Sequence, residues 1–153
     1  MKIYDQIPPN LIFLDLCPKE KEQLLKDIVA NMKEKGFISN ERKILEKLLE
    51  REHLCCTALE KGIAVPHALI DIENPPLVAL ARIKEGVNFE SADRMPTYII
   101  MMLLGNKNDP GSHLRFLARI CRLVKETQFV EKARQAETPS EILAILKEEE
   151  KKI

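Results

Sequence analysis

Three side chains of this sequence have the types needed to handle a phosphoryl group. His67 directly follows Pro66 at the close of the apolar run 63–65, His113 lies in the first turn of a predicted helix, and Arg51 lies near the end of another. A neutral imidazole is a good nucleophile near pH 7 and can carry a phosphoryl group on one ring nitrogen. A guanidinium can stabilise the negative charge of that group in transit. If the three side chains converge, this chemistry needs no metal ion and no cofactor.

The same residues also have a plainer interpretation. A histidine after a proline is commonly a turn residue, and a histidine near a helix start is commonly solvated. His67 and His113 are 113 − 67 = 46 positions apart, so spacing alone does not show that they meet. His53, beside Arg51, is expected on an exposed helix end without a role. Both interpretations stay open at this point.

The four cysteines, Cys17, Cys55, Cys56 and Cys121, offer a weaker second chemistry. A zinc site made from the adjacent pair at 55–56 with nearby histidines is disfavoured, because no C-x-x-C spacing is present. We expect the four thiols to be reduced and buried as small apolar side chains.

The elements that must position these residues follow from hydrophobic periodicity. Apolar residues at helical spacing predict a first helix from Pro18 to Gly36 and a second from Ser39 or Asn40 to about Arg51-Glu52. A third helix is predicted from Asp109 onward and a short fourth at 129–136. A last helix is predicted to follow the capping sequence 138–141. The third helix is expected to bury Leu114, Leu117, Ala118, Cys121 and Val124. Strands are predicted at 63–65, at 77–83 between Pro75-Pro76 and Gly86, and at 97–104, with a short fourth at 88–90. His67 is thus expected at a strand end, and the tail 147–153 is expected to be frayed.

This pattern predicts a single α/β domain over residues 1–153, with a mixed β-sheet flanked by helices. The 24 basic and 24 acidic side chains cancel, which argues against a protein that binds nucleic acid by neutralising phosphates. The first residues do not read as a signal peptide, and the longest apolar run, 98–104, is too short to span a bilayer. We therefore expect a cytoplasmic protein.

The stretch LLEREHLCCTALEKGIAVPHA resembles the active-site segment of a known family. This family is the enzyme IIA domains of the phosphoenolpyruvate-dependent sugar phosphotransferase system, fructose/mannitol type, which includes the nitrogen-regulatory IIA proteins. The shared elements are Arg51-Glu52, Thr57, the run 62–65 and Pro66-His67. Downstream, NFESADRMPTYIIMMLLG, SHLRFLARICRLV and FVEKARQAETPSEILAIL resemble the family's later segments, so the likeness covers nearly the whole chain.

The resemblance implies a mixed sheet flanked by helices and a phosphotransferase component with a phosphohistidine intermediate. His67 would accept phosphate from the histidine-containing phosphocarrier protein, His113 would lie beside it, and Arg51 would shape the site. The phosphate would pass to a IIB protein or domain, with peripheral contact to a membrane permease. In the nitrogen-regulatory alternative, phosphorylation would instead control binding to regulatory target proteins, with transfer weakened or lost.

One segment departs from the family pattern. Between Thr57 and Gly62 the family usually has a glycine-rich turn, and here Ala58 and Glu60 occupy positions where glycine is common. Glycine permits positive φ and close backbone approach. Glu60 adds a negative charge that would repel a dianionic group if it pointed inward, although we expect it to face water. The departure makes catalytic competence the open question.

Overall fold

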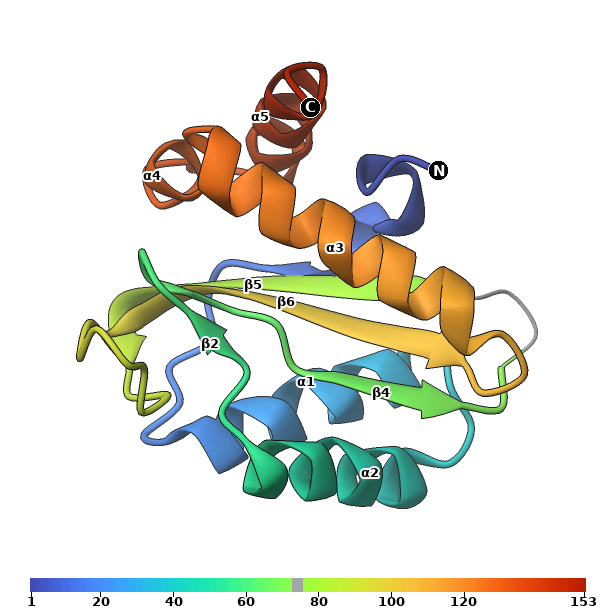
Figure 1. Cartoon of the computed structure of the whole chain (residues 1–153). Coiled ribbons are helices and arrows are strands. Elements are labelled where there is room, and N and C mark those ends of the chain that lie inside the picture. Colours follow the sequence, from blue (N-terminus) through green and yellow to red (C-terminus); the bar gives the residue numbers. More distant parts are fainter. Residues whose placement is uncertain (73–75) are drawn as a thin grey trace.

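A mixed β-sheet forms the centre of the computed structural model, which describes residues 1–72 and 76–153. Helices cover both faces, with α1 (Lys21–Glu34) and α2 (Glu41–Leu54) on one side. On the other side lie α3 (Pro110–Glu126), α4 (Phe129–Ala133) and α5 (Pro139–Glu150) (Figure 1). Each face of the sheet buries its own apolar cluster. This confirms the predicted fold class.

Within the described residues the sheet has six strands: β1 (Ile12–Phe13), β2 (Ala58–Leu59), β3 (Ile63–Ala64), β4 (His67–Ile70), β5 (Leu77–Val87) and β6 (Thr97–Asn106). The order is β1-β5-β6-β3-β2, and β4 also pairs with β6. Strand β6 is buried along almost its whole length, as its two-sided hydrophobicity predicts. Two short 3₁₀ helices, η1 (Tyr4–Gln6) and η2 (Pro9–Leu11), precede β1.

The prediction that His67 follows the end of a strand is wrong. Strands β3 and β4 both run parallel to β6, and the pairs Ile63–Ile99 and His67–Leu103 keep one register. Pro66 has no N–H, so it interrupts the ladder, but its carbonyl still accepts from the Leu103 N–H at 2.9 Å. β3 and β4 therefore follow one line along β6, with β2 paired to the outer side of β3, and His67 is the first residue of the edge strand β4.

Helix α3 is rotated from the predicted face. Its buried residues are His113, Phe116, Ile120, Leu123 and Val124. Leu114, predicted to be buried, is 68% exposed, and Ala118 and Cys121 are exposed too. The predicted stripe omitted Phe116, whose burial turns the helix so that His113 faces the sheet. Asp109 caps the helix through the Ser112 N–H, as predicted.

The end of the chain is not frayed, because two carboxylates of α5 are buried and paired. Glu150 accepts from the Ile3 N–H at 2.7 Å and from Arg119 Nε at 2.6 Å. Glu149 forms ion pairs with Lys132 and Lys152. These contacts tie the first and last segments of the described chain to each other and to α3.

Other element boundaries differ by a few residues. α1 begins at Lys21 instead of Pro18, α2 continues to Leu54, and α4 is shorter than the predicted helix at 129–136. β5 continues past the predicted end at Ile83 to Val87, and the segment 88–90 is not a strand. Pro75, predicted to bracket β5, lies outside the described residues. Asn40 caps α2 and Thr138 caps α5, in agreement with the sequence.

Candidate functional site

His67 is held by the backbone two residues before it. Its Nδ1 lies 2.7 Å from the Val65 carbonyl oxygen. A carbonyl can only accept, so Nδ1 carries the hydrogen, and in the neutral ring Nε2 keeps the lone pair. The side chain is half-buried on the same face of the edge strand as Ile63 and Val65, which is the face that α3 covers. The strand therefore presents Nε2 as a nucleophile.

His113 lies next to His67. The two ring centroids are 5.5 Å apart, with the planes tilted by 48°. His113 comes from the first turns of α3 and is 9% exposed. The structure therefore brings together the two histidines that are 46 positions apart (113 − 67).

Gly105 makes this arrangement of the histidines sterically possible. A Cβ at position 105 would lie 2.1 Å from Nδ1 of His113, a separation that side chains do not tolerate. The glycine is in β6, two residues beyond Leu103, the pairing partner of His67. The sequence indicated Gly105 only as a strand end. The missed signal was a glycine inside an otherwise bulky central strand, which often marks a close approach.

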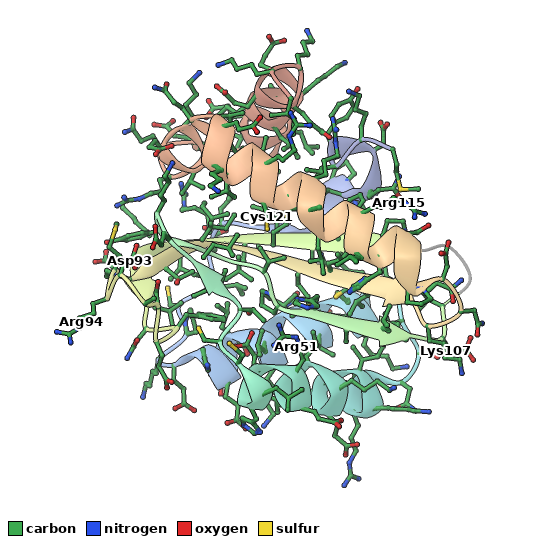
Figure 2. All side chains as sticks on the ribbon, viewed as in Figure 1. Arg51, Asp93, Arg94, Lys107, Arg115 and Cys121 are labelled. Atoms are coloured by element: carbon green, nitrogen blue, oxygen red, sulfur yellow. The ribbon has the colours of Figure 1, made fainter. Side chains whose placement is uncertain are left out.

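Arg51 lies on the last turn of α2, and Figure 2 shows it close to β4. Its Nη1 donates to the Cys55 carbonyl at 2.9 Å. This hydrogen bond fixes the guanidinium just beyond the helix end. His53, two residues on, is exposed as predicted.

The site favours neutral imidazoles. Burial is the main cause that lowers the pKa of His67; the Arg51 charge lowers it as well, while the Val65 hydrogen bond and Glu52 oppose the shift. Burial also lowers the pKa of His113, and the neighbouring His67 adds to this effect. A histidine must be uncharged to act as a nucleophile. Both shifts therefore keep the pair in the reactive form at neutral pH.

The turn that departs from the family pattern lies far from the histidines. Residues 60–62 close the β2–β3 hairpin, and the Gly62 carbonyl accepts from the N–H groups of Tyr98 and Ile99. His67 pairs with Leu103, four to five residues further along β6, which corresponds to about 15 Å. Glu60 is exposed, as expected. Its side chain faces water, so the alternative of an inward-pointing, repulsive charge is not what the structure shows.

Most of the cysteine side chains lie at the surface. Cys17, Cys55 and Cys121 are exposed and Cys56 is half-buried, so the expectation of four buried thiols is wrong. Over residues 1–72 and 76–153, no group of three histidine, cysteine or acidic side chains is placed to hold a metal ion. Across the same ranges, none of the helices is long and apolar enough to cross a membrane.

Comparisons with known proteins agree with this fold. The family model described as "Phosphoenolpyruvate-dependent sugar phosphotransferase system, EIIA 2" matches residues 5–149. The chain therefore belongs to this family of phosphoryl carriers, which also includes nitrogen-regulatory proteins.

Two curated relatives illustrate its breadth. The PTS system fructose-specific EIIABC component of Bacillus subtilis is 28% identical over 151 residues, which is 99% of this chain but only 24% of that protein. The Nitrogen regulatory protein of Bradyrhizobium diazoefficiens is 32% identical over 146 residues, which is 95% of each chain. The chain thus spans about a quarter of the first relative and nearly all of the second.

Solved structures share the architecture. Nitrogen Regulatory Protein IIA-Ntr from Neisseria meningitidis aligns with a TM-score of 0.85 at 27% identity, covering 94% of this chain and 98% of that chain. Enzyme IIA for mannitol from Escherichia coli, solved in complex with phosphorylated enzyme IIB, aligns with a TM-score of 0.74 at 19% identity, covering 93% and 99%. The second likeness shows the fold alone.

Proposed function

We propose that this protein carries a phosphoryl group on Nε2 of His67, as a cytoplasmic component of a phosphoenolpyruvate-dependent phosphotransferase chain. The observation that supports the proposal most directly is the imidazole pair: His67 with Nδ1 bonded to a carbonyl, and His113 with its ring centroid 5.5 Å away. The donor would be the histidine-containing phosphocarrier protein, and the acceptor a IIB protein or domain.

The transfer step balances without an external acid or base. The Nε2 lone pair attacks phosphorus, a new N–P bond forms, and the N–P bond to the donor imidazole breaks. The donor ring carries a hydrogen on its second nitrogen and leaves as a neutral imidazole, while the hydrogen on Nδ1 stays with His67 and remains bonded to the Val65 carbonyl, so the positive charge passes from the donor ring to the His67 ring. Since no proton has to move, the protein contributes position and charge, with Arg51 and His113 near the phosphoryl oxygens.

Apolar surface beside the site fits a protein partner. Leu114, which adjoins His113 along the chain, is 68% exposed, and Ala118 and Cys121 continue the exposed face of α3. Cys121 is labelled beside that helix in Figure 2 and is exposed. A carrier exchanges its phosphate with other proteins, so contact area next to the reacting nitrogen is expected.

Labelling tests the proposal. The protein is incubated with phosphoenolpyruvate, the general phosphotransferase enzyme and the phosphocarrier, and acid-labile, base-stable phosphate is measured. We expect about one phosphate per chain in the wild type, none in His67→Ala, and unchanged labelling in His53→Ala, the matched surface control. An unlabelled wild type, or a labelled His67→Ala protein, would contradict the carrier function.

A regulatory role is the second candidate. The Bradyrhizobium nitrogen regulatory protein matches over 95% of both chains, so the similarity extends over essentially the whole of that protein. The two roles differ in the fate of the phosphate. Rapid transfer to a purified IIB protein supports sugar uptake. A phosphorylated form that is not discharged by IIB, and that binds a target protein differently from the unphosphorylated form, supports regulation.

A further inference from the structure

A chain of hydrogen bonds leads from a buried carboxylate to the nucleophilic ring. Glu52 accepts from the Thr57 hydroxyl, and its other oxygen accepts from the Thr57 N–H at 3.3 Å. The Thr57 carbonyl in turn accepts from the Val65 N–H at 3.0 Å. The Val65 carbonyl holds Nδ1 of His67 at 2.7 Å. Each link is a separate contact, and together they connect α2 to the edge strand.

The carboxylate end of this chain is firmly fixed. The side chain of Glu52 is 1% exposed and forms an ion pair with Lys21 of α1, Nζ to Oε2 at 3.4 Å. A buried carboxylate needs several donors to offset its desolvation, and Glu52 has three: a hydroxyl, a backbone N–H and an ammonium group. Glu52 also directly follows Arg51, so whatever fixes Glu52 fixes the helix end that carries the guanidinium.

We propose that Glu52 and Thr57 are positioning residues that set the orientation and tautomer of His67 through the backbone of Val65. They touch neither the phosphoryl group nor the reacting nitrogen. The Thr57–Val65 hydrogen bond anchors Val65 through its N–H, and the carbonyl of the same residue, in the next peptide unit, receives Nδ1–H. With that carbonyl in place, the hydrogen stays on Nδ1 and the lone pair stays on Nε2.

The physical argument rests on what the ring would do without this anchor. A free imidazole exchanges its hydrogen between the two nitrogens and rotates about its side-chain bonds. Only one tautomer and a narrow range of orientations aim a lone pair at an incoming phosphorus atom. Misplacement of a reacting group by about 1 Å can cost on the order of 100-fold in rate. Besides this positioning role, which it shares with Thr57, Glu52 has an electrostatic role of its own. Its negative charge raises the pKa of the His67 ring and partly offsets the lowering by Arg51.

Nitrogen NMR of the unphosphorylated protein tests the positioning directly. In the wild type we expect the His67 ring to show a protonated Nδ1 and an unprotonated Nε2 at pH 8. In Thr57→Val, which replaces the hydroxyl by a methyl group, we expect a mixture of tautomers. Thr57→Ser keeps the hydroxyl and is the matched control, with the wild-type spectrum expected. This readout does not depend on phosphorylation, so it can fail or succeed separately from the proposed carrier function, on which the kinetic test below rests.

The kinetic test is a double-mutant cycle on the rate of labelling. Glu52→Gln and Thr57→Val are each expected to slow transfer by about 10- to 100-fold, and the double variant by no more than the slower single variant, because the two residues act in series. Thr57→Ser is expected within twofold of wild type. Circular dichroism and thermal melting identify any variant that fails to fold. The cycle is then repeated with Lys21→Met, which removes the ion pair to Glu52 at the far end of the series of hydrogen bonds.

The pH dependence separates the two roles. The negative charge of Glu52 raises the pKa of His67. Glu52→Gln removes that charge, so the acid limb of the rate profile should move to lower pH. Thr57→Val changes no charge and should leave the limb in place. The proposal is overturned if folded Thr57→Val keeps the wild-type tautomer, or if both single variants transfer within twofold of wild type.

Discussion

The hairpin end and the histidine end of the line formed by β3 and β4 differ in exposure and in packing. At one end, Glu60 and Lys61 are exposed, Lys61 has φ 75°, and the buried Gly62 has φ 86°. At the other end, His67 is half-buried, hydrogen-bonded to the backbone and packed beside His113. Both ends pair with the same central strand, β6. The turn end carries exposed side chains such as that of Glu60, whereas at the histidine end His67 packs beside His113 of α3.

The departures from the family pattern lie in the β2–β3 hairpin segment and not at His67. Ala58, paired with Ala64, lies about 10 Å along the strand from His67, and Glu60 belongs to the hairpin turn, about 15 Å along the strand from it. A charge at that distance in contact with water is largely screened, since the Debye length is about 8 Å at physiological ionic strength. The departures from the family pattern therefore alter the side chains of the β2–β3 hairpin. The candidate site keeps Arg51, His67 and His113. Four experiments test this division.

Gly105→Ala should have the largest effect, because it places a methyl group on the histidine end. The new Cβ would lie 2.1 Å from the His113 ring, which must move away from His67. We expect a loss of about 1–3 kcal/mol in the free energy of unfolding and a fall in the labelling rate at least as large as that of His113→Ala. Urea unfolding and labelling measure the two effects. Wild-type values for both would mean that the contact with Gly105 is not needed.

His113→Ala should slow transfer by about 100-fold while the protein stays folded, because a group next to the phosphoryl oxygens is lost but the strand that holds His67 is not changed. Labelling kinetics and circular dichroism together provide the test. Leu114→Ala, a change at the exposed neighbouring position, controls for damage to the helix. Loss of the folded state in His113→Ala would argue for a structural role instead.

Acid should weaken the folded state through the same end of the strand. The native pKa of both His67 and His113 is lowered below 6.5 by burial, so below pH 6.5 the unfolded chain binds protons more readily than the native state. Stability is therefore fully present above pH 6.5 and falls as pH drops toward the native pKa values. Chemical denaturation at pH 7.5 and 5.5 measures the loss. A His67→Asn/His113→Asn double variant should lose less, and an equal loss would assign the effect to other groups.

Glu60→Gln should have the smallest effect. It removes the charge of the altered turn and keeps the shape of the side chain, and the charge faces water. Labelling rates within twofold of wild type are expected at both low and physiological salt. A clear acceleration at low salt would show that the turn does act on the phosphoryl group, and the division between the two ends would fail.

Much of the fold could be predicted from sequence because its signals are local. Capping residues such as Asn40, Asp109 and Thr138 and the apolar run of β6 identified most elements correctly. The site was harder. The type of residue at 67 and 113 indicated the chemistry, but their meeting depends on the rotation of α3, which Phe116 sets, and on the space above Gly105.

Two errors have a common physical origin. Pro66 was expected to end a strand because it lacks an N–H, yet β6 supplies the partner for its carbonyl and the pairing resumes at the next residue. The charged tail was expected to be frayed, yet the N–H groups of Ile3 and Tyr4 and the Arg119 side chain give Glu150 its donors. In both cases a distant segment satisfies a polar group that local sequence leaves unsatisfied, and local patterns do not carry that information.

The continuous register of β3 and β4 has a consequence for how phosphate is exchanged. A histidine on a loop can reach toward a partner, but His67 shares the cooperative unit of the central strand and moves only when the sheet moves. Under the proposed carrier function, a partner would therefore have to bring its phosphorus to a fixed point in space. Exchange becomes a problem of docking, in which donors and acceptors are distinguished by how well their surfaces fit, while the reactivity of the nitrogen stays the same for all of them.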